Sequence, residues 1–394
     1  MEFEEYKLSQ VAYYKNEKIS TESINIKNYI STENMLSEKR GIQNANKLPE
    51  TKSVKKYEMN DILISNIRPY FKKIWFSNNS GGASNDVIVI DTLNNIVVND
   101  YLYYYLSQDS FFNYMTQTSK GTKMPRGDKE AIMNYVIKVP DSIHLQKRIA
   151  DFGKSIDKKI EINKKIIANL EELSQALFKH WFVDFEFPDE NGNPYKSSGG
   201  EMIESELGRM PKGWSINPLE NIMAIKSGKR PSRKSEIENE IYNIPIIGAS
   251  KIMGYTDNLL YDEKILVMGR VGTHGIIQKY YGRTWPSDNT FVIKSDYFEY
   301  VFQYLKIIDY KSLNRGSTQP LLSQKDIKKY SVKSPDDITL VKEFEDEVSN
   351  LNQLIKIKNV ENEKLISLRD TFLPKLMSGE LEIPEDVEVD EGEL

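Results

Sequence analysis

Two stretches of the chain decide its fold: GTKMPRGDKEAIMNYVIKVPDSIHL at residues 121–145 and GSTQPLLSQKDIKKYSVKSPDDITL at residues 316–340. They align without a gap at an offset of 195 residues, and the alignment continues through the segment that follows. A second block, DILISNIR at residues 61–68, matches KILVMGRV at residues 264–271 at an offset of 203. Two copies of one module predict a molecule with an internal two-fold, which suits a target that is itself divided in two.

A long helix is predicted after each repeated loop, over residues 140–187 and 335–379. Each helix begins with Pro-Asp followed by Ser or Asp, short side chains whose oxygens accept hydrogen bonds from the first helical amides. Apolar residues then recur at spacings of three and four, which favours a coiled coil, and Asn163 and Asn362 interrupt the two stripes. Pro374 and Gly379 are expected to stop the second helix.

The remaining segments form two similar modules, residues 1–139 and 212–334, each with short β-rich runs, an aromatic helix and the repeated loop. This pattern predicts an α+β domain in each module. A polar linker at residues 188–211 separates the first helix from the second module, and residues 380–394 form an acidic tail. The predicted order is therefore module, helix, linker, module, helix and tail.

The charge of the chain is unevenly distributed, although its net value is only −5. The second module carries 19 Lys and Arg against 12 Asp and Glu, whereas residues 335–394 carry 6 against 17. A locally basic face attracts a polyanion even when the whole protein is acidic, because the steering field is local. The basic excess therefore favours nucleic acid as the partner of the modules.

The chain contains no cysteine, which excludes disulfides and thiolate metal sites and favours a reducing compartment. Its first residues do not resemble a signal peptide, and no stretch reaches the roughly 18 apolar residues of a membrane span. The sequence has neither a phosphate-binding GxxxxGK(S/T) loop nor a glycine fingerprint for a methyl donor. It therefore predicts a cytoplasmic protein without a membrane partner, without catalytic residues and without a cofactor.

Three phrases carry a resemblance to a known family: LFKHWFVDFEFP at residues 177–188, PKGW at 211–214 and LRDTFLPKLMSGEL at 368–381. Together with the duplication, they resemble the specificity subunit of type I restriction-modification systems over essentially the whole chain. The resemblance implies two α+β target-recognition domains joined by two long antiparallel coiled-coil helices, with an internal pseudo-two-fold.

The same resemblance implies a non-catalytic subunit that recognises a bipartite target in double-stranded DNA. It also implies that two DNA methyltransferase subunits bind the chain and that ATP-dependent endonuclease subunits join them. S-adenosylmethionine, ATP and Mg²⁺ would belong to those partners. The alternative is a coiled-coil scaffold whose two globular heads bind protein.

The repeated loops and two basic clusters are the candidate DNA contacts. A glycine lets each loop backbone approach a duplex closely, while neighbouring cations and amides reach phosphates or base edges. The other interpretation is an ordinary turn or a solvated loop, and the tripeptides SND at residues 84–86 and SDN at 287–289 are also open to a purely structural role. The predicted DNA-binding residues are Arg68, Lys72, Lys73, Lys120, Lys123, Arg126, Lys229, Arg230, Arg233, Lys234, Arg315, Thr318 and Gln319.

The end of the first helix is rich in aromatic residues, more than a two-helix stem can easily bury. Either a recognition domain or a partner subunit covers these side chains. We expect a methyltransferase subunit to bind there, because buried aromatic residues dominate protein interfaces. The predicted partner-binding residues are Leu177, Phe178, Trp181, Phe182 and Phe185.

Overall fold

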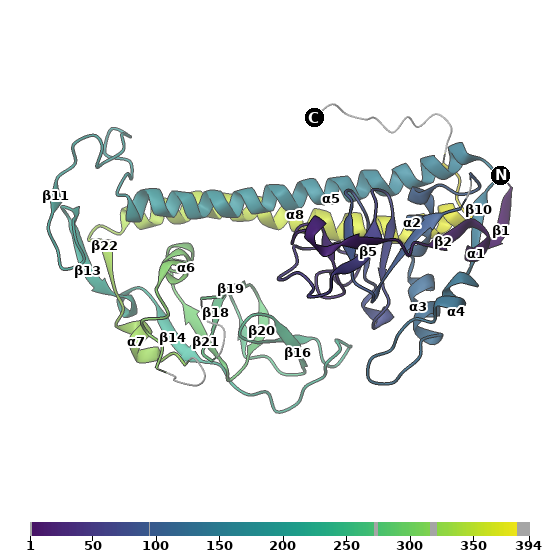
Figure 1. Ribbon diagram of the computed structural model, residues 1–394. Helices are drawn as coiled ribbons and strands as arrows, with labels where there is room; N and C mark the ends of the chain where they lie inside the picture. The colour runs from purple at the N-terminus through teal and green to yellow at the C-terminus, as the bar shows by residue number, and fades with distance from the viewer. Residues whose placement is uncertain (1, 94, 272–274, 316–320, 384–394) are drawn as a thin grey trace. The chain divides into compact units, whose positions relative to one another are not determined.

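The computed structural model describes residues 2–93, 95–271, 275–315 and 321–383. The chain folds as two compact units: the first combines residues 1–163 with 359–394, and the second is residues 164–358. Each unit holds one α+β module and part of each of two long helices, α5 (Ile143–Phe178) and α8 (Thr339–Ser378) (Figure 1). Both helices therefore belong to both units.

The helices α5 and α8 pack antiparallel, as two polar contacts of the first unit show. Arg369 Nη1 lies 2.6 Å from Asp157 Oδ1, and Asn163 Nδ2 lies 3.0 Å from Asn362 Oδ1. Residue numbers therefore decrease along α8 in the direction in which they increase along α5. The two asparagines that interrupt the apolar stripes bind each other inside the helix pair.

Both helices begin beside the acceptor side chains that the sequence predicts. Ser142 Oγ accepts a hydrogen bond from the amide of Leu145 at 3.3 Å. Asp337 Oδ1 accepts one from the amide of Thr339 at 2.9 Å. Each contact satisfies a backbone donor that has no partner within the helix.

The predicted helix stop is confirmed at Gly379 and wrong at Pro374, because α8 continues through Pro374 and ends at Ser378. Proline removes one helical hydrogen bond. The turn around it is nevertheless retained, since Leu373, Leu376 and Met377 are all buried in the core of the first unit. Continuing the helix keeps these three side chains packed, which offsets the lost hydrogen bond.

The first module contains two four-stranded sheets, with the orders β2-β9-β6-β7 and β3-β5-β8-β4, and a separate antiparallel pair of β1 with β10. The short helices α1 to α4 and two 3₁₀ turns complete it. The bounds are β1 Phe3–Lys7, α1 Leu8–Val11, β2 Ala12–Tyr14, β3 Lys18–Ser20, η1 Thr21–Ser23, β4 Tyr29–Ile30, β5 Ser53–Tyr57, β6 Ile62–Ser65, η2 Pro69–Phe71, β7 Ile74–Phe76, β8 Gly81–Ala83, β9 Val87–Thr92, α2 Asn99–Leu106, α3 Asp109–Gln117, α4 Lys129–Met133 and β10 Val136–Pro140.

The second module has sheets of order β14-β21-β18-β19 and β16-β15-β20-β17, and an antiparallel pair of β13 with β22. A π-helical turn, η3, and the pair β11-β12 precede it. The bounds are η3 Lys179–Val183, β11 Met202–Ile203, β12 Met210–Pro211, β13 Trp214–Pro218, η4 Leu219–Asn221, β14 Ala224–Ser227, β15 Ile244–Ile247, β16 Ile252–Thr256, β17 Tyr261–Asp262, β18 Ile265–Gly269, β19 Ile277–Tyr280, β20 Arg283–Pro286, β21 Thr290–Lys294, α6 Phe298–Ile307, α7 Gln324–Lys328 and β22 Ser331–Pro335.

The two modules repeat one topology. The pair β1-β10 corresponds to β13-β22, and the sheet β2-β9-β6-β7 corresponds to β14-β21-β18-β19. In the other sheet β4-β8-β5 corresponds to β15-β20-β17, because the first contact is parallel and the second antiparallel in both modules. The fourth strand differs: β3 lies beside β5, whereas β16 lies beside β15 on the opposite edge. The modules therefore share the order of three strands in this sheet and differ in the position of the fourth, at its edge.

The strand registers correct the alignment of the second sequence block by one residue. Ile62 pairs with Ile90, and the equivalent pair is Leu266 with Ile293. Ile62 therefore corresponds to Leu266 and not to Ile265. A shift of one residue turns a side chain to the opposite face of a sheet, and both Ile62 and Leu266 face the core next to the long helices.

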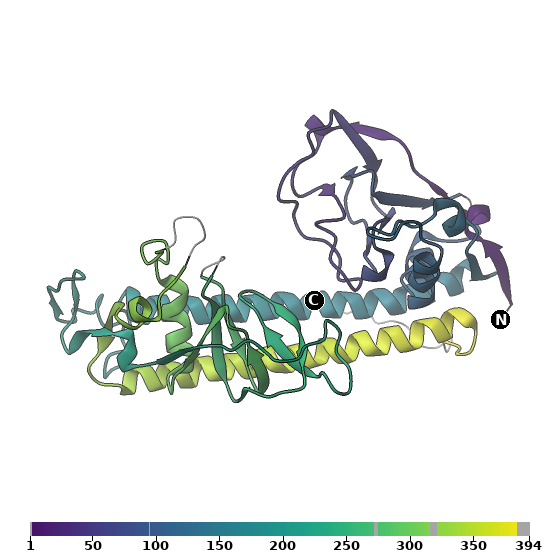
Figure 2. The same ribbon diagram turned by 90° about the horizontal axis from the view of Figure 1, so that it is seen from below.

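Each unit has its own principal core, formed between a sheet, the helices of its module and the two long helices. In the first unit Phe111 of α3 belongs to one buried cluster with Ile149 of α5 and Leu376 of α8. In the second unit Phe178 of α5 packs against Phe344 of α8. Figure 2 shows the strand-rich part of the first module on one side of the two long helices. The long helices thus complete the core of each module.

The confirmed fold is two α+β domains joined by two long antiparallel helices. Along the described residues, no helix is long and apolar enough to cross a bilayer. The segment bounds predicted from the sequence stay predictions, and the two compact units divide inside α5 and α8.

Candidate nucleic-acid interface

The repeated loop of the first module closes into a hairpin beside the end of β6. The amide of Lys120 donates to the carbonyl of Arg126 at 2.8 Å, and the amide of Arg126 donates back at 2.9 Å. The amide of Arg68 donates to the carbonyl of Pro125 at 2.7 Å, which joins the segment after β6 to the loop. The structure therefore brings Arg68, Lys120 and Arg126 together.

Two of these cations lie against carboxylates without being buried. Arg126 Nη2 lies 3.1 Å from Asp86 Oδ1, and Lys120 Nζ lies 2.5 Å from Asp128 Oδ2. The hydrogen bond with Asp128 raises the pKa of Lys120. Lys123, at the tip of the loop, is exposed. All of these cationic groups remain accessible to a polyanion.

Lys72 and Lys73 are held by other parts of the module. Lys72 Nζ lies 2.9 Å from Asp109 Oδ2. Lys73 Nζ donates to the carbonyl of Thr32 at 2.6 Å, and burial lowers the pKa of Lys73. The structure does not bring them to the loop, and their contact with DNA stays a prediction.

The loop of the second module closes in the same way. The amide of Arg315 donates to the carbonyl of Leu321 at 3.0 Å, and Leu321 forms a bridge with Val271 after β18. Arg315 Nη2 lies 2.5 Å from Asp326 Oδ1. Thr318 and Gln319 lie outside the described residues. Arg315 is thus the structural equivalent of Lys120.

The basic cluster of the second module lies in the segment after β14. Arg233 Nη2 lies 3.1 Å from Asp257 Oδ2, while its own side chain is 68% exposed. Lys229, Arg230 and Lys234 are exposed as well. The cluster therefore presents its positive charges to solvent along one short segment.

Arg270, at the end of β18, was not predicted from the sequence. Its amide donates to the carbonyl of Asn289 at 2.9 Å, and its carbonyl accepts from the amide of Leu322 at 3.0 Å. These bonds place Arg270 directly beside the repeated loop. The signal was present in the sequence, since Arg270 lies within the second repeated block.

The predicted partner-binding aromatics need a correction. Phe178, Trp181, Phe182 and Phe185 are each at most 9% exposed and form part of the core of the second unit. The ring of Phe182 lies 4.7 Å from that of Tyr300 on α6. The sequence left open whether a recognition domain or a partner subunit covers these rings. The structure shows the recognition domain of the same chain, because α6 and α8 bury them.

Leu177 differs from its aromatic neighbours because it is only partly buried. Leu173, one turn earlier on α5, is 52% exposed. At the repeat offset these residues correspond to Phe372 and Leu368 of α8, which are 39% and 41% exposed. Each unit therefore presents an equivalent apolar pair near the end of a long helix.

Equivalent cavities lie beside these apolar pairs. The cavity of the first unit, about 290 Å³, is lined by Asp370 and Leu373 of α8 together with residues of α2 and α3. The cavity of the second unit, about 430 Å³, is lined by Gln175 and Phe178 of α5 together with Ile307 of α6. At the repeat offset Asp370 corresponds to Gln175, and Leu373 to Phe178. The two surfaces are therefore equivalent under the internal repeat.

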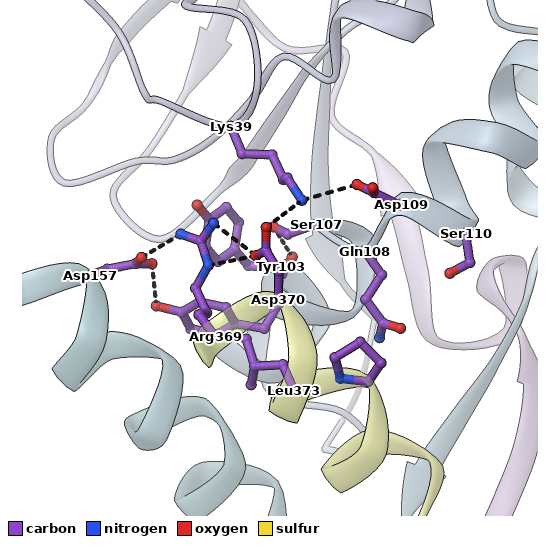
Figure 3. A pocket seen from close by; sticks show the side chains of 12 residues that line it. Lys39, Tyr103, Ser107, Gln108, Asp109, Ser110, Asp157, Arg369, Asp370 and Leu373 are labelled. Carbon is purple, nitrogen blue, oxygen red and sulfur yellow. Dashed lines mark hydrogen bonds and ion pairs between the residues drawn. The ribbon is translucent and has the colours of Figure 1, made fainter. Parts of the chain in front are cut away.

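Charged side chains line the first cavity, as Figure 3 shows. Lys39 Nζ reaches over it to Asp109 Oδ1 at 3.0 Å and to Asp370 Oδ2 at 3.4 Å. Arg369 lies between Asp157 Oδ1, at 2.6 Å, and Asp370 Oδ1, at 2.9 Å. These ion pairs fasten the strand-rich part of the first module to α3 and α8.

Comparison with known proteins gives consistent matches. The model of a family described as "Type I restriction modification DNA specificity domain" matches residues 1–172 and 211–367. The chain is similar to the specificity subunit of the type I restriction enzyme HindI of Haemophilus influenzae, with 23% identity over 86% of this chain and 90% of the relative. It is also similar to the MjaIX specificity subunit of Methanocaldococcus jannaschii, with 26% identity over 69% of this chain and 66% of the relative.

A solved structure shares the fold. The S subunit of a type I restriction-modification system from M. genitalium matches with a TM-score of 0.54 and 15% identity, over 97% of both chains. The family model covers most of this chain in two segments, one for each module. The resemblance stated from the sequence is thereby confirmed: the chain belongs to the family of type I restriction-modification DNA specificity proteins.

Proposed function

We propose that this chain reads a DNA target of two parts, one part with each module, for a type I restriction-modification complex. The observation that carries this proposal is the repeated loop, which closes on the end of a strand through the same backbone bonds in both units. The side chains on this shared frame differ between the modules, as two different half-targets require. Family membership supports DNA as the ligand.

The long helices maintain the spacing between the half-targets in this proposal. Half-targets read from one face of a duplex lie about one helical turn, or a multiple of it, apart. Because α5 and α8 are continuous and contribute to both units, a change in their length changes the target spacer and leaves the bases that are read unchanged.

The equivalent apolar pairs and cavities of the two units bind two copies of one partner in this proposal. A methyltransferase subunit of the same complex is that partner, and ATP-dependent endonuclease subunits then join the assembly. The chain itself catalyses no step, and S-adenosylmethionine, ATP and Mg²⁺ bind to the partners.

Methylome sequencing tests the proposed function. A host that expresses this chain with its methyltransferase subunit should carry one new methylated motif made of two short specified parts and an unspecified spacer. The methyltransferase subunit alone should give no motif. A continuous motif, or methylation without this chain, contradicts the proposal.

The partner surface is tested by Leu368→Lys and its equivalent Leu173→Lys. Both positions are exposed, so each variant should keep the thermal stability of the chain while its complex loses one of two methyltransferase copies. The control is Lys158→Glu, a charge change at an exposed position of α5. Full assembly of both Leu variants would place the partner elsewhere.

A further inference from the structure

The two modules support the same backbone frame with different side chains. The amide of Gly127 donates to the carbonyl of Asn66 at 3.0 Å, as that of Leu322 does to Arg270. The amide of Asn66 donates to the carbonyl of Asp86 at 2.8 Å, as that of Arg270 does to Asn289 at 2.9 Å. Asp86 and Asn289 are therefore equivalent positions.

An ion pair occupies this frame in the first module. Arg126 Nη2 lies 3.1 Å from Asp86 Oδ1, and the two side chains are 52% and 39% exposed. The equivalent residues of the second module are Leu321 and Asn289, which cannot form an ion pair. The frame thus folds without the pair, and such an exposed pair contributes little to stability because water screens it. Stability does not account for it.

One member of the pair, Asp86, belongs to a polar cavity of the first module. Asp86 lines this cavity of about 240 Å³, whose walls come largely from the connection between β4 and β5. Gln43, Asn46 and Lys47 line it with exposed side chains that make no hydrogen bond within the described part of the chain. These two amides and one cation, together with the carboxylates of Glu33 and Asp86, form a polar surface that can meet polar edges such as those of base pairs.

The chemistry of the pair selects guanine. A guanidinium presents its donors as a rigid fork, so a carboxylate on one nitrogen fixes its direction while other donors stay available. Arginine donating two hydrogen bonds to O6 and N7 of guanine is the commonest specific contact in the major groove. Asp86 therefore acts as a positioning residue for Arg126.

Building on the proposed function, we infer that Arg126 reads the guanine of a G·C pair in the half-target of the first module. Leu321 takes the equivalent place in the second module, so that module reads no guanine from this position. The half-target of the first module accordingly contains at least one G·C pair.

The test uses the complete methyltransferase complex and the target found by methylome sequencing. Arg126→Lys keeps the charge but loses the fork. Its preference for a G·C pair over other base pairs at one position of one half-target should fall by about 5-fold to about 150-fold. The bases read in the other half-target should be unchanged. Arg126→Leu should do the same and should fold, because Leu321 occupies the same frame. Asp86→Asn, which copies Asn289, should weaken the preference less than either.

A substituted base identifies the contact itself. Replacing the guanine of that pair by 7-deazaguanine removes the N7 acceptor, so it should weaken binding by the wild-type complex and have no further effect on Arg126→Leu, which has no donor for N7. Arg68→Lys is the matched control: it makes the same exchange at a neighbouring exposed arginine and should leave the preference for that G·C pair unchanged. The inference is overturned if Arg126→Lys keeps the wild-type base preference at every position of the target. It is also overturned if the half-target of the first module contains no G·C pair. Loss of the bipartite motif in the normal complex would instead refute the proposed function.

Discussion

The partly buried carboxyl group of Glu345 joins α8 to α6 in the second unit. Its Oε1 accepts a hydrogen bond from the amide of Tyr300 at 2.7 Å, in the first turn of α6. The pKa of Glu345 is raised from 4.5 to about 7, mainly by burial and also by the nearby Glu299, although that hydrogen bond and Lys264 oppose the rise. A side chain of α8 thus caps α6, although its charge is poorly solvated.

The raised pKa of Glu345 predicts how stability depends on pH. Below pH 4.5 the carboxyl is protonated in both states, and its stabilising effect is lost as the pH rises through about 7. Glu345→Gln keeps an acceptor oxygen and removes the charge, so its melting temperature should fall less than that of the normal chain between pH 5 and 8. Glu343→Gln, an exposed neighbour, is the control. Parallel profiles of Glu345→Gln and the normal chain would contradict this cause.

Gly153 of α5 provides room for a ring of the first module. A Cβ atom at this position would lie 2.7 Å from Cε1 of Tyr104, whose hydroxyl donates to Asp157 Oδ2 at 2.9 Å. That hydrogen bond holds the ring beside Gly153. The apolar stripe read from the sequence includes the neighbouring Phe152 but gives no sign of this contact, since it depends on a residue of another element.

Gly153→Ala should therefore destabilise the first unit. Alanine favours a helix by about 1 kcal/mol over glycine, whereas overpacking a well-packed core costs about 1–3 kcal/mol. The steric cost is the larger, and denaturant unfolding should show a net loss. Lys158→Ala on the exposed face of α5 should not lower stability. A more stable Gly153→Ala would show that Tyr104 moves freely.

At the scale of elements, the asparagine pair sets the register of the long helices. Asn163 is fully buried and Asn362 is 8% exposed. A single Asn362→Leu leaves the amide of Asn163 buried without its acceptor, which should cost about 1–3 kcal/mol. Replacing both asparagines by leucine should restore stability, because an apolar pair leaves no unsatisfied group, but the helices should lose their unique alignment. Equal losses in the single and double variants would refute this account.

The sequence predicted most elements but not the contacts between them. Helical spacing and end-capping residues identified α5 and α8, since these features are local. The strand alignment was wrong by one residue because a β-strand alternates every two residues and the neighbouring apolar side chains Ile265 and Leu266 give equal matches. Only the pairing of Leu266 with Ile293 resolves them.

The sequence also predicted only part of the candidate site, because contacts between distant segments are not visible in it. Composition and repetition pointed to the loops, which the structure joins to the strand ends. Lys72 could not be separated from Arg68 by sequence, because its partner Asp109 lies in a later helix. The aromatic segment after α5 was expected to meet a partner, since the sequence does not show that Tyr300 and Phe344 cover it.

At the scale of the whole molecule, exchanging one module should exchange one half-target. Replacing residues 212–334 by the matching segment of a relative should change the part read by the second module. The other part and the spacer length should be kept, because the first module, α5 and α8 are retained. Methylome sequencing of the hybrid checks this. A hybrid with both parts changed, or with only the spacer changed, would contradict one module for each half-target.

The division of the chain into units also predicts the order in which it folds during synthesis. The second unit is a continuous segment, residues 164–358, whereas the first unit needs residues 359–394 in addition to residues 1–163. Leu373, Leu376 and Met377 of that last segment lie in the core of the first unit. The module made first on the ribosome therefore matures last, and a message cut short after residue 358 yields a chain with only its later half complete.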